Sequence, residues 1–207
     1  MPLPFANTKF ISAHHYLTSH NEYALKRVSS SLGATISQMI RPILHYGDPV
    51  LHERSSHVEK ITADVEALID DMIDTMYSAS GVGLAAPQVG EPLRLFVADP
   101  SGGTTSGELV IMINPEWVVQ TGEQREDEGC LSIPGLSARI LRPQKAILSG
   151  LDRAGSPQEI EGTGILARAF GHEMDHLGGT LFPDHLRGIR RDIMKRKIKK
   201  LRRSEQW

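Results

Sequence analysis

Apolar residues recur at helical spacing in three separate parts of the chain, which predicts three amphipathic helices. The first begins after Thr62, a good N-terminal cap, and carries Asp64 and Glu66 in its first turn, where acids favour a helix. We expect Gly81 to end it. Its buried face is predicted to contain Val65, Leu68, Ile69, Met72, Ile73 and Met76.

The second predicted helix begins after Thr163 and stops at Gly178, where we expect left-handed backbone. Its apolar stripe consists of Ile165, Leu166, Ala169, Phe170 and Leu177. The third helix lies within residues 186–207 and is basic and amphipathic. One face of this third helix carries Ile189, Ile193, Lys197 and Leu201.

Short apolar runs between the first two helices alternate with turn signals and are typical of strands, at 94–98, 109–113 and 146–151. Helices that bracket such strands predict an α+β fold, with small antiparallel or mixed sheets packed around the second helix. Residues 39–207 are long enough to form one domain with its own core. No apolar run approaches the roughly 18 residues of a membrane-spanning helix, so we expect no membrane partner.

The first 38 residues differ in composition from the rest. They contain three Lys or Arg against one acid, Glu22, and lack the apolar run of a secretory signal. We interpret residues 1–38 as a disordered extension, or as the result of a wrongly assigned start codon, with Met39 as the true first residue. An organelle transit peptide is the alternative.

Positive charge is concentrated at the C-terminus. Residues 186–207 carry ten Lys or Arg and two acids, a net charge of +8, whereas the other 185 residues carry a net charge of −10. A basic helix can be a solvent-exposed helix that packs on the acidic remainder of the protein, and it can also be a helix that contacts RNA. The charge pattern alone supports the two interpretations equally.

The most specific pattern is His-Glu-Met-Asp-His at 172–176. Residues four apart lie on one face of a helix, so His172 and His176 can point at one divalent cation, with Glu173 beside a metal-bound water. A catalytic zinc or iron site usually has three protein ligands, so one ligand is still missing. A pair of hydrogen-bonded core histidines is the alternative interpretation.

The third ligand is not found downstream of the histidines, because Phe182 occupies the position where the metzincin pattern requires a histidine. The single cysteine, Cys130, is the upstream candidate. A thiolate with two imidazoles suits Zn²⁺ or Fe²⁺ better than Mg²⁺ or Ca²⁺. The alternative for Cys130 is a small buried apolar residue. A lone cysteine also favours a reducing compartment.

Residues 81–88, Gly-Val-Gly-Leu-Ala-Ala-Pro-Gln, form a third pattern. They do not complete a nucleotide-binding loop, because no third Gly, Lys or Ser/Thr follows at the required spacing. Gly83 can bring the backbone close to an extended substrate, and Gln88 can offer an amide donor to a developing oxyanion. A Gly-rich turn before a strand of small residues is the alternative.

Together these segments resemble the motifs of the peptide deformylases. The chain carries them in the family's order, as GVGLAAPQ (81–88), EGCLS (128–132) and HEMDH (172–176), and the similarity extends from about residue 39 to residue 186. The resemblance implies that Cys130, His172 and His176 hold the metal, which would be Fe²⁺ with Zn²⁺, Ni²⁺ or Co²⁺ as substitutes.

The resemblance also implies the roles of other residues. Glu173 would be the general acid/base, Gln88 and the Leu131 amide would form the oxyanion hole, and the backbone of Val82 and Gly83 would pair with the substrate as an added strand. The implied reaction is hydrolysis, by a metal-bound hydroxide, of the N-formyl group on the initiator methionine of newly made polypeptides, with release of formate.

Partners and compartment follow from the same resemblance. The substrates would be formyl-methionyl nascent peptides in the cytoplasm, or in an organelle if residues 1–38 are a transit peptide. Some deformylases dock on the ribosome through a C-terminal helix, which suggests the same hypothesis for residues 186–207. One residue departs from the family pattern: Gly171 replaces a Gln, which removes a supporting side chain and costs roughly 1 kcal/mol of helix propensity relative to Ala.

Two other functions remain as alternatives. One is a thiol hydrolase with Cys130 as the nucleophile, which needs no metal. The other is a non-catalytic RNA-binding module built on the basic tail, in which Glu173 has no role.

Overall fold

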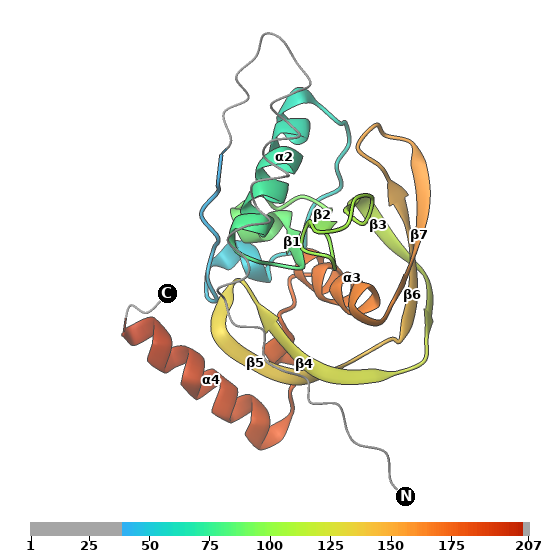
Figure 1. Cartoon of the computed structure of the whole chain (residues 1–207). Helices are drawn as coiled ribbons and strands as arrows, with labels where there is room; N and C mark the ends of the chain where they lie inside the picture. Colours follow the sequence, from blue (N-terminus) through green and yellow to red (C-terminus); the bar gives the residue numbers. More distant parts are fainter. Residues whose placement is uncertain (1–38, 205–207) are drawn as a thin grey trace, which may run out of the picture. The chain divides into compact units, whose positions relative to one another are not determined.

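The computed structural model describes residues 39–204, so the interpretation of residues 1–38 concerns a part of the chain that lies outside the described residues. A five-stranded sheet of order β1-β2-β3-β6-β7 and a two-stranded β4-β5 hairpin carry the fold (Figure 1). Every pairing between these strands is antiparallel, which confirms the antiparallel form of the prediction. The strands are β1 (Gly83–Ala85), β2 (Leu95–Ala98), β3 (Val110–Thr121), β4 (Gln124–Cys130), β5 (Ile133–Arg142), β6 (Lys145–Leu151) and β7 (Pro157–Thr163).

Three α-helices and three short 3-10 helices complete the described part of the chain. The α-helices are α2 (Ala63–Ser78), α3 (Gly164–Leu177) and α4 (Gly188–Arg203), which confirms the three predicted helices. The 3-10 helices are η2 (Pro49–His52), η3 (Ala86–Val89) and η4 (Phe182–His185). Among residues 39–204, no helix combines the length and apolarity that crossing a membrane would require.

The first helix begins as predicted but ends differently. The Oγ1 atom of Thr62 accepts the N–H of Val65 at 3.4 Å, and Val65 itself is only half-buried. Ser80, not Gly81, takes the left-handed conformation, with φ of 54°, so that the Gly81 N–H reaches the Met76 carbonyl at 2.9 Å. Gly81 is small for another reason, because a Cβ there would lie 2.9 Å from the side chain of Leu131.

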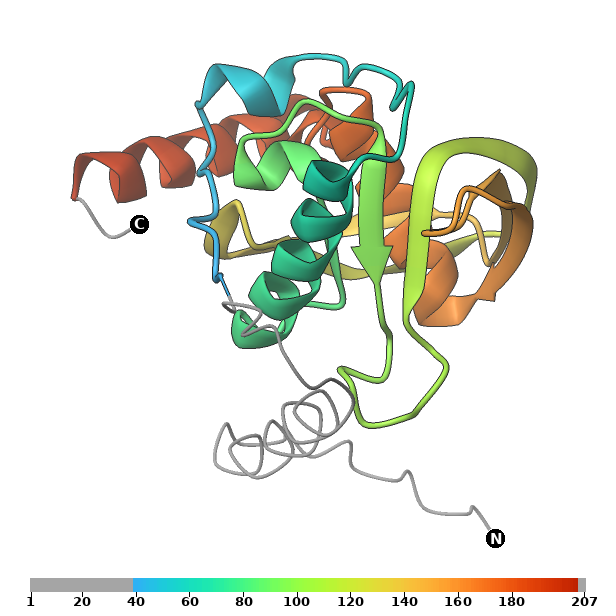
Figure 2. The same cartoon turned by 90° about the horizontal axis from the view of Figure 1, so that it is seen from above.

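Helix α3 lies at the centre of the fold, against the five-stranded sheet (Figures 1 and 2). Two details differ from the sequence prediction. Gly178 keeps helical backbone, with φ of −89°, and Gly179 takes the left-handed turn at +73°. Ile165 is 60% exposed because it lies in the first turn, at the rim of a cleft. The core between α3 and the sheet contains Ala85, Phe96, Ala98, Val110, Met112, Ala146, Leu148, Ala167, Ala169, Phe170 and Leu177.

Helix α4 packs on a second core through a face that the sequence prediction missed. Met194 and Ile198 are buried, whereas Ile189 is 71% and Ile193 41% exposed, so the predicted apolar stripe is not the packing face. The reason is helical spacing: Leu201 completes an i, i+4, i+7 row with Met194 and Ile198. The core beneath this face contains Leu51, Ile133, Ile140, Leu181, Phe182 and Leu186.

Candidate active site

The three sequence motifs come together around one cleft of about 580 Å³. The β1–η3 segment forms one wall, the turn between β4 and β5 forms another, and α3 supplies the third. Nearly all the predicted site residues line it: Val82, Gly83, Gln88, Cys130, Leu131, His172 and Glu173. His176, which is 1% exposed, lies behind Cys130.

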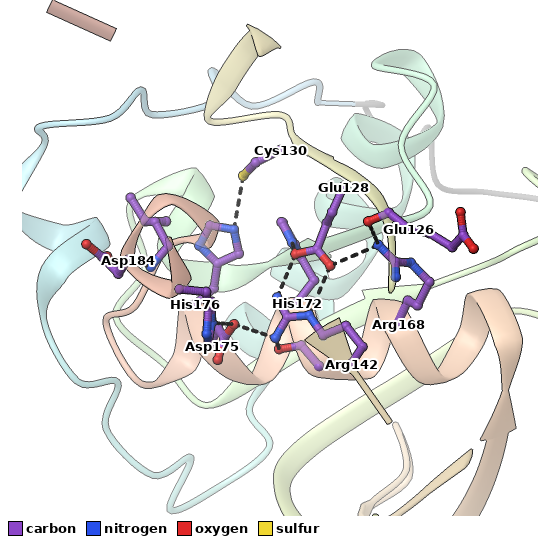
Figure 3. Close-up of polar contacts among 12 residues, drawn as sticks. Glu126, Glu128, Cys130, Arg142, Arg168, His172, Asp175, His176 and Asp184 are labelled. Atoms are coloured by element: carbon purple, nitrogen blue, oxygen red, sulfur yellow. Dashed lines mark hydrogen bonds and ion pairs between the residues drawn. The ribbon is translucent and has the colours of Figure 1, made fainter. Parts of the chain in front are cut away.

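Three side chains that could together hold a metal ion lie at the base of this cleft. The ligand atoms of Cys130, His172 and His176 all lie within 4.8 Å of one another, and Cys130 Sγ is 3.2 Å from His176 Nε2 (Figure 3). A break in the β4–β5 register between Gly129 and Cys130 turns the cysteine side chain toward α3. One thiolate and two imidazoles fit Zn²⁺, Fe²⁺ or a similar transition metal.

Glu128 orients the first histidine of this set. Its Oε1 atom lies 2.8 Å from His172 Nδ1, so a proton on Nδ1 leaves Nε2 free to bind a metal. Burial alone would raise the pKa of Glu128, but hydrogen bonds from Arg142 and His172 outweigh it and lower the pKa to about 2. Glu128 is therefore an ionised carboxylate at neutral pH.

Arg142 holds Glu128 in place. Its guanidinium donates to both carboxylate oxygens of Glu128, at 2.6 and 2.9 Å, and its Nη1 donates to Asp175 at 2.6 Å (Figure 3). Asp175 also lies 2.6 Å from His185 Nε2. A network of charges therefore connects helix α3, which carries both histidines, to strand β5, where Arg142 is the last residue.

The arginine also fills the space beside Gly171. Arg142 Nη1 donates to the Gly171 carbonyl at 3.1 Å, and a Cβ at Gly171 would lie 2.9 Å from Arg142 Cδ. The glycine thus brings the guanidinium against the backbone of α3. The side chain missing from Gly171 is replaced by that of Arg142.

The two histidines differ in their electrostatic environment. Burial lowers the pKa of both, but the neighbouring Cys130 and Glu128 raise the pKa of His172 well above 6.5. The pKa of His176 stays well below 6.5, because burial and the adjacent His172 both lower it. The two imidazoles therefore favour carrying one proton between them rather than two.

Glu173 is the best-placed acid/base in the cleft. It is 2% exposed, and within residues 39–204 its Oε2 atom has no hydrogen-bond partner. Burial raises its pKa to about 7, against a smaller opposing effect of His172. Its carboxylate lies against Gly83, where a Cβ would overlap Oε1 and lie 2.9 Å from Cδ. Gly83 is therefore required by the position of Glu173 as well as by the substrate cleft.

The predicted amide donor faces the metal ligands. Gln88 Oε1 accepts the Ala85 N–H at 2.9 Å, which directs Nε2 toward Cys130 Sγ at 3.6 Å and Ser132 Oγ at 3.2 Å. Leu131 and Ser132 form the turn between β4 and β5. The Gln88 amide is thus held rigidly beside the site where a substrate carbonyl would lie.

Strand β1 is an edge strand with one neighbour, β2. The Asp99 N–H donates to the Val82 carbonyl at 2.8 Å, so Val82 already uses its carbonyl within the sheet. Backbone groups alternate in direction along an antiparallel strand, and those of Gly83 therefore point to the open edge. Gly83, more than Val82, is suited to pair with an added strand.

Sequence reasoning assigned no role to four residues that support the site: Glu128, Ser132, Arg142 and Asp175. Three of them lie within the EGCLS and HEMDH motifs, so their closeness in sequence to Cys130 and the two histidines could have indicated a role in the site. Arg142 has no such local signal, because only the pairing of β4 with β5 brings it to Glu128.

Comparisons with known proteins show what this chain is similar to. Residues 40–192 match the family model described as polypeptide deformylase. A peptide deformylase of Thermodesulfovibrio yellowstonii is 46% identical over 160 residues, covering 77% of this chain and 97% of that protein. One from Lachnoclostridium phytofermentans is 49% identical over 148 residues, covering 72% and 90%.

Solved structures that resemble this chain are also those of peptide deformylases. The crystal structure of a peptide deformylase from Legionella pneumophila has a TM-score of 0.75 at 44% identity, covering 80% of this chain and 97% of that one. The peptide deformylase of Thermus thermophilus has a TM-score of 0.74 at 35% identity, covering 80% and 99%. The chain belongs to the peptide deformylase family, metal-dependent hydrolases that remove the N-formyl group from newly made polypeptides.

Proposed function

We propose that this chain deformylates nascent peptides with Cys130, His172 and His176 as metal ligands and Glu173 as the proton carrier. The convergence of those three ligand atoms within 4.8 Å, beside a buried Glu173, is the observation that carries the proposal. When bound, the divalent cation supplies a Lewis acid for the formyl carbonyl and lowers the pKa of water.

The protein groups then have separate roles. Glu173, with its pKa raised to about 7, takes a proton from the attacking water and returns it to the leaving amine. The Gln88 amide and the Leu131 N–H stabilise the negative charge that develops on the formyl oxygen. The open edge at Gly83 holds the peptide backbone in register, so that the formyl group lies over the metal ligands.

We further propose Fe²⁺ as the native metal. The mixed thiolate and imidazole ligands accept Fe²⁺, Zn²⁺, Co²⁺ and Ni²⁺, so metal analysis must be combined with an activity assay. Protein purified without oxygen is expected to release formate from formyl-Met-Ala-Ser, to lose this activity in a chelator, and to regain more of it with Fe²⁺ than with Zn²⁺.

The same assay separates the metal mechanism from the thiol-hydrolase alternative. A thiol hydrolase would work equally well in the chelator and would accumulate a formyl thioester on Cys130, visible by mass spectrometry. Either result would reject the proposed mechanism. Activity restored equally by Fe²⁺ and Zn²⁺ would reject the iron assignment alone.

We also propose that the enzyme works in the cytoplasm and that the outer face of α4 contacts ribosomal RNA. Arg196, Lys199 and Arg203 are exposed on this helix and, at helical spacing, face away from the buried row of Met194 and Ile198. Phosphate contacts by such residues make binding strongly dependent on salt.

A charge-reversed variant of the outer face, Arg196→Glu/Lys199→Glu/Arg203→Glu, is expected to lose co-sedimentation with ribosomes at low salt. Deletion of α4 would not test this, because it would uncover the core beneath Met194 and Ile198.

The matched control reverses three exposed cations on other elements, Arg54→Glu/Lys60→Glu/Arg125→Glu, with the same change in net charge. This control should still sediment with ribosomes. Equal loss in both variants would show a general charge effect and contradict a specific contact.

A further inference from the structure

A second hollow adjoins the substrate cleft on the side of α4. Its volume is about 650 Å³, and it is lined by Pro134, Gly135 and Leu136 of β5 and by Lys197, Lys200 and Leu201 of α4. Pro134 and Gly135 also line the substrate cleft. The two hollows are therefore separated by a wall of two residues, and we call the second one the β5–α4 groove.

The two residues that separate the hollows do not close the passage between them. Pro134 and Gly135 are both exposed, and nothing lies within 4 Å of an ideal Cβ at Gly135. Gly135 has φ of +75°, which turns the chain sharply between the cleft and the groove. A bound peptide can thus cross this wall without displacing a side chain.

The groove has the chemistry of a peptide-binding surface with a charge preference. Its lining combines the apolar side chains of Pro134, Leu136 and Leu201 with the ammonium groups of two lysines. Within residues 39–204, neither Lys197 nor Lys200 forms an ion pair. Such a surface fits an extended chain that carries carboxylates.

We propose that the β5–α4 groove is a distal subsite that binds acidic residues of the nascent peptide through Lys197 and Lys200. The proposal rests on the deformylase function of the adjoining cleft. An extended peptide advances about 3.3 Å per residue, so the fourth to sixth residues after the formyl group would reach the groove once the chain has crossed the two-residue wall.

The test compares formyl-Met heptapeptides that differ only at positions five and six, with Glu-Glu or Lys-Lys. For each enzyme, kcat/KM is divided by the value for formyl-Met-Ala-Ser, which is too short to reach the groove. The native enzyme is expected to favour the acidic heptapeptide by roughly 3- to 10-fold, mainly through KM, since two exposed ion pairs are each weak. High salt should remove the preference.

Two variants decide which lysines are responsible. Lys197→Glu/Lys200→Glu should reverse the preference. Lys195→Glu/Lys199→Glu makes the same charge change at exposed positions of α4 that do not line the groove, and should keep the preference. Reversal in both variants would indicate the general field of the helix and overturn the proposal.

Other outcomes are also decisive. Equal rates for the acidic and basic heptapeptides, with formyl-Met-Ala-Ser still hydrolysed, would reject the subsite but not the deformylase function. A Lys197→Glu/Lys200→Glu variant that loses RNA binding without any change in peptide preference would assign the groove to nucleic acid and overturn the proposal. Failure to hydrolyse any of the three peptides would reject the proposed function itself.

Discussion

Replacement of Glu173 by alanine is expected to lower kcat by about 10²–10⁴-fold, the usual contribution of a positioned acid/base, while the bound metal is retained. Glu173 lies beside the ligand set without belonging to it, because the three ligand atoms come from Cys130, His172 and His176. Its raised pKa of about 7 suits proton transfer in both directions near neutral pH. Loss of this carboxylate removes the proton carrier and leaves the ligands unchanged.

Glu173→Gln is the better-matched variant, because it keeps the size of the side chain next to Gly83. Metal content by elemental analysis and thermal unfolding should match the native enzyme in this variant, whereas formate release should be lost. Near-native formate release in this variant would contradict the assignment of Glu173 as the proton carrier. Loss of metal would show that the carboxylate acts as a ligand, contrary to the proposal.

The helices that carry the chemistry could be predicted because their signals are local. The spacing of His172 and His176 places both on one face of any α-helix, whatever surrounds it. The cap at Thr62 likewise depends on neighbouring backbone groups only, and the structure shows its hydrogen bond. Such features need no knowledge of the rest of the fold.

The errors occurred where tertiary contacts decide. Gly81 was expected to end the first helix, but it is glycine because Leu131, from another segment, approaches it. The predicted packing face of α4 was wrong because the helix carries two rows of apolar residues, one that includes Lys197 and one that includes Met194 and Ile198. Only contact with the core beneath the helix determines which row is buried. Local periodicity contains no information about which face a partner covers.

The supporting network was missed for a related reason. Glu128 and Arg142 lie on the paired strands β4 and β5, with Glu128 opposite Ala138 and Arg142 opposite Gln124, so the long Arg142 side chain has to reach along the hairpin to the carboxylate. A basic residue at the end of a strand is usually exposed, so nothing in the sequence around Arg142 indicates burial. Its importance appears only when the register and the position of α3 are known.

Arg142→Leu is expected to reduce both stability and metal affinity. The change leaves Glu128 buried without its main partner, and breaking a buried ion pair in this way typically costs about 3–5 kcal/mol. For a chain of this size, the midpoint of thermal unfolding should fall by about 6–20 °C. Metal affinity should fall by about 10–100-fold, since Glu128 would no longer hold His172 firmly.

Arg153 provides a matched control for this variant. It forms a two-point contact with Asp70, at 2.6 and 2.9 Å, but its side chain is 38% exposed. Arg153→Leu should therefore cost no more than about 1 kcal/mol and leave metal affinity unchanged. Equal losses of stability in the two variants would contradict the special role of the buried network.

A double variant separates the structural role of Arg142 from its positioning role. In Glu128→Leu/Arg142→Leu, the unpaired buried carboxylate is gone, so part of the lost stability should return. Metal affinity should stay low, because His172 Nδ1 still lacks the oxygen that lies 2.8 Å away in the native protein. If stability and metal affinity recovered together, Arg142 would act only by stabilising the fold. Recovery of stability alone would show that Glu128 and Arg142 position the metal ligand.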